Sequence, residues 1–376
     1  MDTVSFTKSI KDKALGLGFD LVGISPADCF PENQYYKQWL RHGFSGEMKY
    51  LDRSPERRER LQRVLPNAKS VISCALNYNT EYPYSVDERD KSKGWISRYA
   101  WGDDYHEIIE DKLRALLNHI GEEASGEVSS KLYVDTGPVL ERVYGKYAGV
   151  GWVGKNTCLI NQEIGSWIFI GEIITSLELD YDIPVPDRCG TCTRCIDSCP
   201  TGAILEPYIL DSRLCISYLT IELKDKIPLE LREGIHNNIY GCDICQDVCP
   251  WNRRAQITDG PEFQPRDDLY NPDLSYLSGL SIEDFRYVFK KSPIKRTKRR
   301  GLLRNVMIAM GNSGNEDFVP HIKECLNDEE PLVRAHAAWA LWKIEGPCSK
   351  EILLHHKSVE TDDKVIEEID LLLNTD

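Results

Sequence analysis

The most informative stretch of this chain is Cys189-Gly-Thr-Cys192-Thr-Arg-Cys195-Ile-Asp-Ser-Cys199-Pro200. Its C-x2-C-x2-C-x3-C-P spacing is typical of segments that hold two [4Fe–4S] clusters. Three thiolates at two-residue gaps surround one face of an iron–sulfur cube, and the fourth turns toward a second cluster. A later run, Cys242-Asp-Ile-Cys245-Gln-Asp-Val-Cys249-Pro250, repeats the same ending with one cysteine fewer. We therefore predict an iron–sulfur domain with two clusters.

The ligands of these clusters can be counted. Two [4Fe–4S] clusters need eight thiolates, and the two runs provide seven, so Cys215, which stands alone between them, is predicted to be the eighth. In bacterial two-cluster ferredoxins the last cysteine of the run binds the other cluster. This crossing rule predicts a first thiol set of Cys189, Cys192, Cys195 and Cys249, and a second thiol set of Cys199, Cys215, Cys242 and Cys245.

Zinc is the alternative ligand for a cysteine-rich segment. Structural zinc sites use separate C-x2-C pairs and gain nothing from a third cysteine two residues later. The N-terminal residues 1–8 lack the basic and apolar segments of a secretory signal, so we expect a reducing compartment, where dense cysteines bind metals rather than form disulfides. The other five cysteines have no partner at metal spacing and are expected to be buried core thiols: Cys29, Cys74, Cys158, Cys325 and Cys348.

Composition and charge limit the class of protein. The chain has 376 residues, of which 41% are hydrophobic and 28% charged, which suggests two or three globular domains. No stretch approaches the roughly 18 consecutive apolar residues of a membrane span, so we expect a cytoplasmic protein without a membrane partner. The net charge is −14, yet residues 290–304 carry eight basic residues and no acid. Such a cationic segment on an acidic protein can steer a polyanion to one place.

Hydrophobic periodicity predicts an α+β multidomain chain with three parts. Residues 1–180 alternate between helical and strand patterns, which indicates an α/β or α+β domain, and residues 181–255 contain the cysteine runs. Residues 256–376 combine a proline-rich linker with helices of HEAT-like texture, which bury a core only by stacking. The predicted elements are helices over 3–16, 104–120, 138–148 and 281–290, and strands over 19–24, 71–76 and 166–177.

Two local motifs fit known cofactor patterns poorly. The segment Gly149-Val-Gly151-Trp-Val-Gly154 matches G-x-G-x-x-G, but a helical pattern precedes it and a strand pattern follows, the reverse of a nucleotide-binding loop. A tight turn beside some cofactor is favoured instead. Asp104-Tyr-His106 is similar to the D-x-H-x-x-G loop of some cobalamin enzymes, but Ile109 stands where the glycine belongs. We therefore expect His106 to be a surface or packed histidine.

Several segments together resemble the epoxyqueuosine reductases. The likeness keeps one order along the chain from residue 1 to about 345. The segments that carry it are Ser97-Arg-Tyr-Ala-Trp-Gly-Asp-Asp-Tyr-His106, Val134-Asp-Thr-Gly-Pro138, Gly151-Trp-Val-Gly-Lys-Asn156, the first cysteine run with its continuation Thr201-Gly-Ala-Ile204, Cys215-Ile-Ser-Tyr-Leu-Thr220 and Tyr240-Gly-Cys-Asp243.

This resemblance implies a function. The family reduces the epoxide of epoxyqueuosine at the wobble position of tRNA to queuosine, and two [4Fe–4S] clusters pass electrons one at a time to cobalamin. An N-terminal domain would hold cobalamin without a histidine ligand. Asp135 matches the family's proton donor, a carboxylic acid that must be protonated near neutral pH, which burial can achieve. Without the resemblance, Asp135 is equally well explained as the cap of a helix that begins near Val139.

The resemblance also implies contacts and partners. Cobalamin contacts would come from Arg58, Ser217 and Tyr240 besides Asp135, although Arg58 also fits a solvated helix face. The expected partners are the anticodon stem-loop carrying epoxyqueuosine, gripped by the HEAT-like helices, and an external low-potential electron donor; the chain is expected to be a monomer. Phosphate contacts, largely indifferent to base sequence, are expected from Lys295, Arg296, Lys298, Arg299 and Arg300.

Two other functions fit the cysteine pattern. The chain could be a cobalamin and iron–sulfur reductase of a small molecule, as the dehalogenases are, or an electron-transfer protein without catalysis of its own. The basic segment and the helical repeat disfavour the small-molecule reductase, because a small substrate needs neither.

Overall fold

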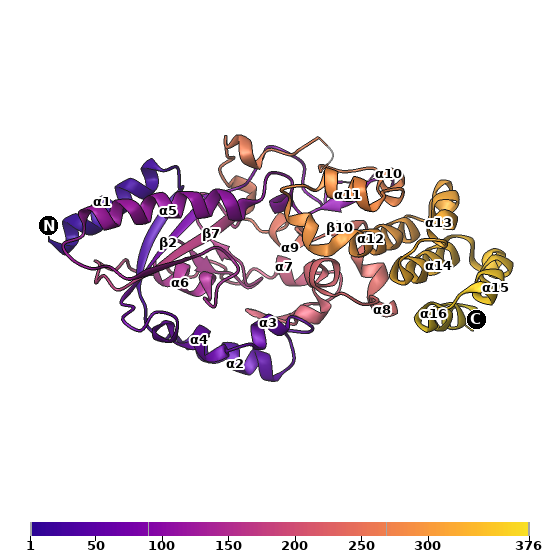
Figure 1. The fold of residues 1–376 in the computed structure, drawn as a ribbon, viewed down its shortest axis with the longest axis horizontal. Coiled ribbons are helices and arrows are strands. Elements are labelled where there is room, and N and C mark those ends of the chain that lie inside the picture. The colour runs from indigo at the N-terminus through magenta and orange to yellow at the C-terminus, as the bar shows by residue number, and fades with distance from the viewer. Residues whose placement is uncertain (1, 89, 268, 375–376) are drawn as a thin grey trace.

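The computed structural model describes residues 2–88, 90–267 and 269–374. The molecule is elongated, with a β-sheet near the N-terminal end and helices at the C-terminal end (Figure 1). The sheet has the strand order β1-β2-β7-β4, and every neighbouring pair is antiparallel. Its strands are β1 (Leu21–Pro26), β2 (Ser70–Asn77), β7 (Ile168–Thr175) and β4 (Ser130–Tyr133).

Helices cover both faces of this sheet, as Figure 1 shows. Helices α1 (Thr3–Gly16) and α5 (Tyr105–Glu123) pack on one face, and α6 (Glu141–Tyr147) packs on the other. Every residue of β2 is therefore buried. The α6 end approaches β1 so closely that a Cβ on Gly23 would lie 2.0 Å from the carbonyl oxygen of Ala148. Only glycine permits this packing.

A helical arm connects the sheet with the cysteine segment. It consists of α2 (Pro31–Arg41), α3 (Lys49–Asp52) and α4 (Pro55–Glu59), which the sequence did not predict. Its contacts with the cysteine segment are specific, because Trp39 Nε1 donates to the carbonyl of Leu210 at 2.7 Å and the backbone N–H of Glu47 donates to the Tyr218 hydroxyl at 2.8 Å.

The cysteine segment is built from short elements, and strands from the N-terminal half pair with it or pack against it. Strand β10 (Asn238–Tyr240) pairs in parallel with β3 (Trp95–Ile96), and the hairpin of β5 (Trp152–Val153) and β6 (Leu159–Ile160) packs beside the thiols. The segment's own elements are α7 (Arg194–Asp197), β8 (Ile204–Glu206), β9 (Ile209–Leu210), a π-helix at Tyr218–Glu222, α8 (Leu229–Arg232) and α9 (Ile244–Asp247).

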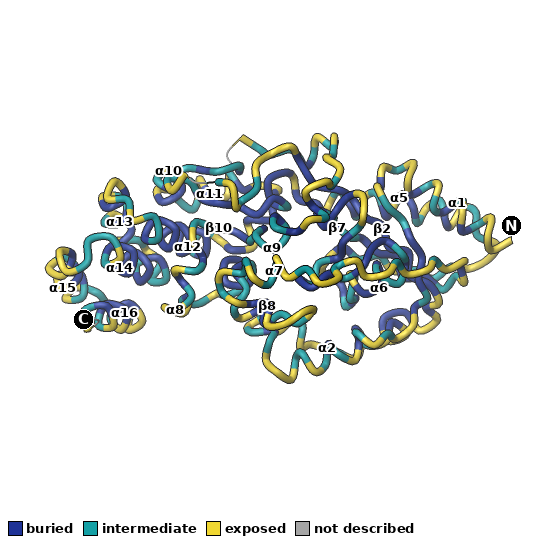
Figure 2. The backbone as a smooth tube through the Cα atoms, turned by 180° about the vertical axis from the view of Figure 1, so that it is seen from behind, coloured by how far each residue is buried: buried dark blue, intermediate teal, exposed yellow. Residues whose placement is uncertain are grey.

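The C-terminal end is helical and shares one core with the cysteine segment. The hydrophobic core runs without a break from Trp95 and Ile239 to Val306 and Leu341, and Figure 2 shows α12 and α14 largely buried. The helical repeats therefore pack on the cysteine segment, and the limits of the three domains stay predictions. The helices are α10 (Leu274–Ser278), α11 (Ile282–Val288), α12 (Lys298–Ser313), α13 (Val319–Cys325), α14 (Pro331–Glu345), α15 (Lys350–Val359) and α16 (Asp363–Leu373).

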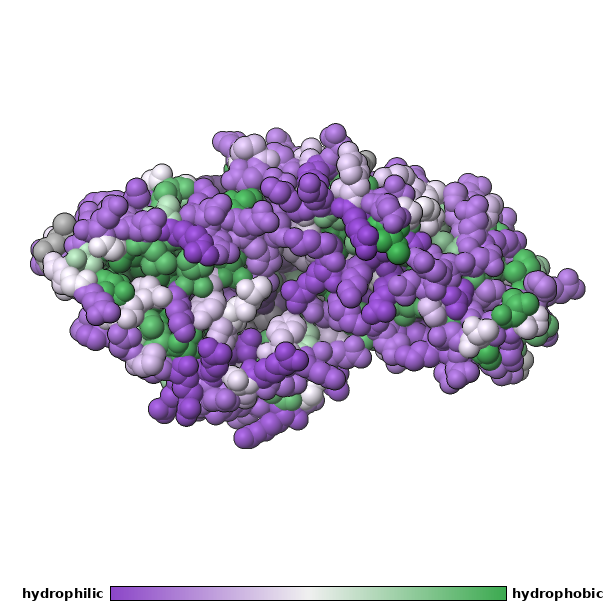
Figure 3. Space-filling model, viewed as in Figure 1, coloured by the Kyte–Doolittle hydropathy of each residue, from purple (hydrophilic) through white to green (hydrophobic). Residues whose placement is uncertain are grey.

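The α+β class is confirmed, and two details of the prediction are wrong. Cys29 and Cys348 are exposed rather than core thiols, whereas Cys74 and Cys325 are buried. The helix predicted over 138–148 begins only at Glu141. The face in Figure 3 is mostly hydrophilic, with apolar groups gathered over the sheet-bearing half. Within the described residues, no helix has the length and apolar character needed to cross a bilayer.

Candidate active site

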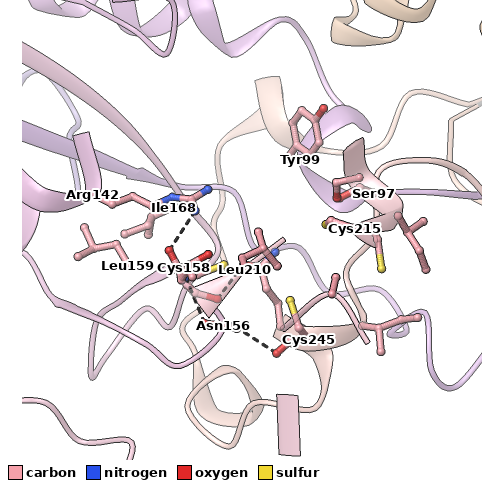
Figure 4. A pocket seen from close by; sticks show the side chains of 18 of the residues that line it. Ser97, Tyr99, Arg142, Asn156, Cys158, Leu159, Ile168, Leu210, Cys215 and Cys245 are labelled. Carbon is pink, nitrogen blue, oxygen red and sulfur yellow. Dashed lines mark hydrogen bonds between the residues drawn. The ribbon is translucent and has the colours of Figure 1, made fainter. Parts of the chain in front are cut away.

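One cavity of about 420 Å³ lies between the sheet-bearing half and the cysteine segment. Tyr105 and Asp135 line it from the N-terminal half, and Ser217 lines it from the cysteine segment. Figure 4 shows Tyr99 and Cys215 on its wall. The four thiols of the second set, Cys199, Cys215, Cys242 and Cys245, also line this cavity. The structure thus brings the predicted proton donor and half of the predicted cluster ligands to one space.

The eight cysteines fall into two groups in space. In the first set, burial and the neighbouring Cys249 and Cys189 raise the pKa of the Cys195 thiol to about 11, and Cys189 and Cys249 also share a hydrophobic cluster with Trp152. In the second set, burial and the neighbouring Cys215 and Cys199 raise the pKa of Cys242. In the described part of the chain, no three His, Cys, Asp or Glu side chains are placed to hold a single metal ion. The grouping supports the crossed assignment of ligands.

The glycine-rich loop holds both cysteine runs in place. Lys155 donates its ammonium protons to the carbonyls of Gly190 at 2.7 Å and Cys192 at 2.9 Å. Its neighbour Asn156 donates to the carbonyl of Cys245 at 3.3 Å (Figure 4). The loop lies within the β5–β6 hairpin and leads into no helix, so the nucleotide-loop alternative is wrong, and the turn lies beside the cavity as expected.

Asp135 lies on the loop between β4 and α6 in a left-handed backbone conformation, with φ +57°. Non-glycine residues seldom adopt this conformation, and they gather at functional sites. The helix-cap alternative is wrong, because α6 begins at Glu141 with Leu140 as its N-cap residue. The Tyr105 hydroxyl donates to Asp135 Oδ2 at 3.0 Å, and His106 Nε2 lies 3.7 Å from the same oxygen.

These contacts set the charge on Asp135. Partial burial raises the pKa of Asp135, but the interactions with His106 and Tyr105 outweigh it and hold the pKa below its ordinary value. Burial lowers the pKa of His106, whereas Asp104 and Asp135 raise it to a net value of about 9. The expectation of a protonated Asp135 at neutral pH is therefore wrong for this structure. The proton of the pair resides on His106.

The other predicted cofactor contacts differ in position. Ser217 lines the cavity and directs its backbone N–H and hydroxyl toward the Cys215 sulfur. Arg58 is buried rather than on a solvated helix face, and it donates to the carbonyl of Gly137 at 3.5 Å, which supports the Asp135 loop. Tyr240 is fully buried behind Tyr99, from which it accepts a hydrogen bond of 3.0 Å. Among these three residues, Ser217 alone lines the cavity.

The predicted tRNA contacts have carboxylate partners that the local sequence does not contain. Arg299 is only 14% exposed and forms two hydrogen bonds with Asp328, so it acts within the fold. Lys298 is exposed and has no ion-pair partner among the residues that the structure describes. The remaining pairs are Lys295 with Asp104 at 3.0 Å, Arg296 with Glu222 at 2.8 Å and Arg300 with Glu330 at 4.0 Å.

Comparison with known proteins identifies the family. The chain is 40% identical to the epoxyqueuosine reductase of Salmonella typhimurium over 342 residues, which cover 91% of this chain and 89% of that protein. It is 46% identical to the enzyme of Leadbetterella byssophila over 302 residues, which cover 80% of this chain and 97% of that protein. The chain belongs to the epoxyqueuosine reductase family. It is therefore a reductase, and the interpretation as a non-catalytic electron-transfer protein is wrong.

Family models and solved structures agree with this assignment. Residues 58–136 match the model "Epoxyqueuosine reductase QueG, DUF1730", residues 188–252 match "4Fe-4S double cluster binding domain" and residues 298–372 match "HEAT repeats". The double-cluster match confirms two [4Fe–4S] clusters over zinc. A crystal structure of an epoxyqueuosine reductase with an epoxyqueuosine-modified tRNA-Tyr stem loop is similar with a TM-score of 0.91 and 30% identity, covering 98% of each chain. One from Bacillus subtilis, with its catalytic aspartate loop swung out of the active site, has a TM-score of 0.89 at 30% identity, again over 98% of each chain.

Sequence reasoning missed four residues of the reductase site. Lys155 and Asn156 were present in a recognised motif, but only the fold shows what they bind. His106 follows Asp104, a good helix cap, and this signal points to a fixed histidine near a helix start. Cys158 lies beside Cys245, and this contact lowers the pKa of the Cys158 thiol to about 7. No sequence spacing connects these two cysteines.

Proposed function

We propose that this chain reduces the epoxide of epoxyqueuosine in the anticodon loop of tRNA to give queuosine, with cobalamin and two [4Fe–4S] clusters as cofactors. The observation that carries the proposal is the single cavity lined by both Asp135 and the second thiol set. An electron source and a proton donor that face one space are what reduction of an epoxide requires. The relative that was solved with an epoxyqueuosine-modified stem loop supports this substrate.

The lining of the cavity fits cobalamin. A corrin ring is flat and apolar with amide groups at its edge, and the cavity offers apolar wall residues such as Leu159 and Ile168. Glu141 also lines it, and its buried Oε1 has no hydrogen-bond partner among the described residues. Burial and the nearby Asp135 raise the pKa of Glu141 to about 8, so a neutral carboxyl is available to an amide. Bound cobalamin supplies a cobalt centre that delivers electrons to the epoxide.

The two thiol sets suggest an order for electron entry. Cys192 of the first set lies just before α7 and Cys195 lies within it, next to the exposed Thr191 and Arg194. The second set lines the cavity. We infer that an external low-potential donor binds near the first set, and that the second set faces the site of reduction.

Asp135 delivers the protons that the departing oxygen needs. In the reaction both C–O bonds of the epoxide break, a C=C bond forms and the oxygen leaves as water, so two electrons and two protons are taken up. A positioned acid contributes roughly 10²–10⁴-fold to such a step. Arg58 keeps the Asp135 loop in place through its hydrogen bond to Gly137.

The test is turnover of an anticodon stem-loop that carries epoxyqueuosine, under anaerobic conditions with a chemical reductant, with and without cobalamin. We expect queuosine only when cobalamin is present, and a loss of about 10²-fold or more for Asp135→Asn. Asp111→Asn, the same change at an exposed position of α5, is the matched control and should turn over normally. Full activity of Asp135→Asn would remove Asp135 from the reaction. Turnover of the free nucleoside as fast as of the stem-loop would favour a small-molecule reductase.

A further inference from the structure

The reaction takes up two protons, and Asp135 can hold only one at a time. In this structure Asp135 is ionised, so a proton must reach it before each transfer. We propose that His106 is the proton source behind Asp135: a positioning residue that passes its Nε2 proton to Asp135 Oδ2, from which it reaches the oxygen that leaves the epoxide. This inference rests on the proposed function, because it concerns the same oxygen.

The geometry places His106 between two carboxylates. Its Nδ1 donates to Asp104 Oδ1 at 2.7 Å, which fixes the ring and directs Nε2 toward Asp135. Nε2 lies 3.7 Å from Asp135 Oδ2, is buried and has no hydrogen-bond partner among the described residues. A distance of 3.7 Å exceeds a hydrogen bond, so a small rotation of the Asp135 side chain must close the gap. A buried imidazole nitrogen without a partner next to a carboxylate is what a proton transfer needs.

The surrounding charges keep this imidazole protonated. Asp104 is 7% exposed and accepts hydrogen bonds from both His106 and Lys295, the latter at 3.0 Å. Other groups that act on the pair are the Tyr105 hydroxyl, bound to Asp135, the charge of Arg296, and the Glu141 carboxyl, whose pKa Asp135 raises. The two carboxylates outweigh burial, so the pKa of His106 is raised to about 9 and the imidazolium is present below that pH.

The proton balance closes with this arrangement. The first proton moves from Nε2 of His106 through Asp135 to the epoxide oxygen as one C–O bond breaks. The neutral His106 keeps its Nδ1–H bond to Asp104. Because Nε2 is buried, its new proton comes from solvent by way of the Asp135 carboxylate, whose side chain is 57% exposed. The second proton follows the same route and the oxygen leaves as water, while the two electrons come from the external donor through the clusters.

The primary test is the pH dependence of turnover. In the natural protein, turnover should fall as pH rises through about 9, because His106 then loses its proton. His106→Gln should reduce kcat by at least about tenfold at neutral pH and remove this alkaline limb, with iron content, cobalamin binding and stem-loop affinity unchanged. His119→Gln is the matched control, because His119 lies on the same helix and pairs with Glu123 instead.

A second variant tests the carboxylate behind His106. Asn is as good a helix cap as Asp, so Asp104→Asn keeps the start of α5 but removes one of the charges that raise the pKa of His106. The alkaline limb should therefore move to lower pH while the imidazole remains. His106→Gln with the natural rate and pH profile would overturn the inference and leave the Asp135→Asn result, and so the proposed function, intact.

A measurement independent of turnover separates the two proposals. Nitrogen NMR of histidine-labelled protein without cobalamin reports the protonation of His106 directly. We expect an imidazolium at pH 7.5, and a neutral ring at this pH would overturn the inference. If the natural protein does not convert epoxyqueuosine at all, the proposed function fails, whereas the NMR titration still decides whether His106 can store a proton.

Discussion

The cysteine segment at 189–249 and the basic segment at 290–300 differ in how well the local sequence predicts the contacts that their side chains make. The thiols lie in the two groups that their spacing predicts. The basic segment has no acid within its sequence, yet the fold pairs four of its five predicted tRNA contacts with carboxylates. Those carboxylates come from as far away in sequence as Asp104 and Asp328.

The difference teaches that the ligands of a cluster are set by residues close together in the sequence, whereas the charge environment of a segment is set by residues far apart in it. A tight loop of a few residues sets the geometry of several thiolates around a cluster, so spacing alone predicts it. Coulomb interactions act between any groups that the fold brings together, so the charge of a segment depends on distant parts of the chain. Arg299, which the sequence predicts to contact tRNA, is only 14% exposed and pairs with Asp328.

The largest effect is expected at Cys215, the predicted cluster ligand that lies outside both cysteine runs. Cys215→Ala should lose one cluster, with about half of the iron and sulfide and all turnover, because no other thiol of the second set replaces it. Anaerobic iron and sulfide analysis measures this loss. Cys348→Ala removes an exposed thiol and is the matched control. A Cys215→Ala protein with the full iron content would break the rule that spacing and count predict the ligands.

A stability effect of intermediate size is expected within the basic segment. Arg299→Gln removes one partner of a pair whose side chains are only 14% and 7% exposed and leaves Asp328 without its counter-charge, which should lower the free energy of unfolding by about 3 kcal/mol. Arg300→Gln, one residue along, alters a half-exposed pair at 4.0 Å and should cost under ~1 kcal/mol. Anaerobic urea unfolding compares the two. Equal, small effects would show that Arg299 is not a structural residue.

The smallest effect is expected from Lys298, which alone of the five predicted tRNA contacts has no ion-pair partner among the described residues. Lys298→Gln should reduce the slope of log affinity for the stem-loop against log salt by about 0.7–0.9, the value of one phosphate contact. Arg299→Gln should leave that slope unchanged, because its charge is already paired with Asp328. Binding measured by fluorescence anisotropy at several salt concentrations gives both slopes. If Arg299→Gln reduced the salt slope and Lys298→Gln did not, the prediction from the sequence that Arg299 contacts a phosphate would stand.

Individual residues show where prediction from sequence stops. The helix over 3–16 and the buried strands around Val71 and Ile173 follow from hydrophobic periodicity, and the structure has them. The antiparallel strand order does not follow, because each strand pairs with a partner far along the chain. Tyr240 was expected at the cofactor, but β10 pairs with β3 and turns its ring behind Tyr99. Asp135 was expected to be protonated, but the start of α5 brings His106 to it.

The amino-acid sequence by itself determined the family and the two iron–sulfur clusters, because ligand spacing and motif order are properties of short segments. The folded arrangement settled which groups carry charge and where each proton resides. His106 forms ion contacts with both Asp104 and Asp135, and Lys295 of the basic segment pairs with Asp104. A protonation state reports every charge nearby in space, and residues remote in sequence become neighbours only when the core between them has formed.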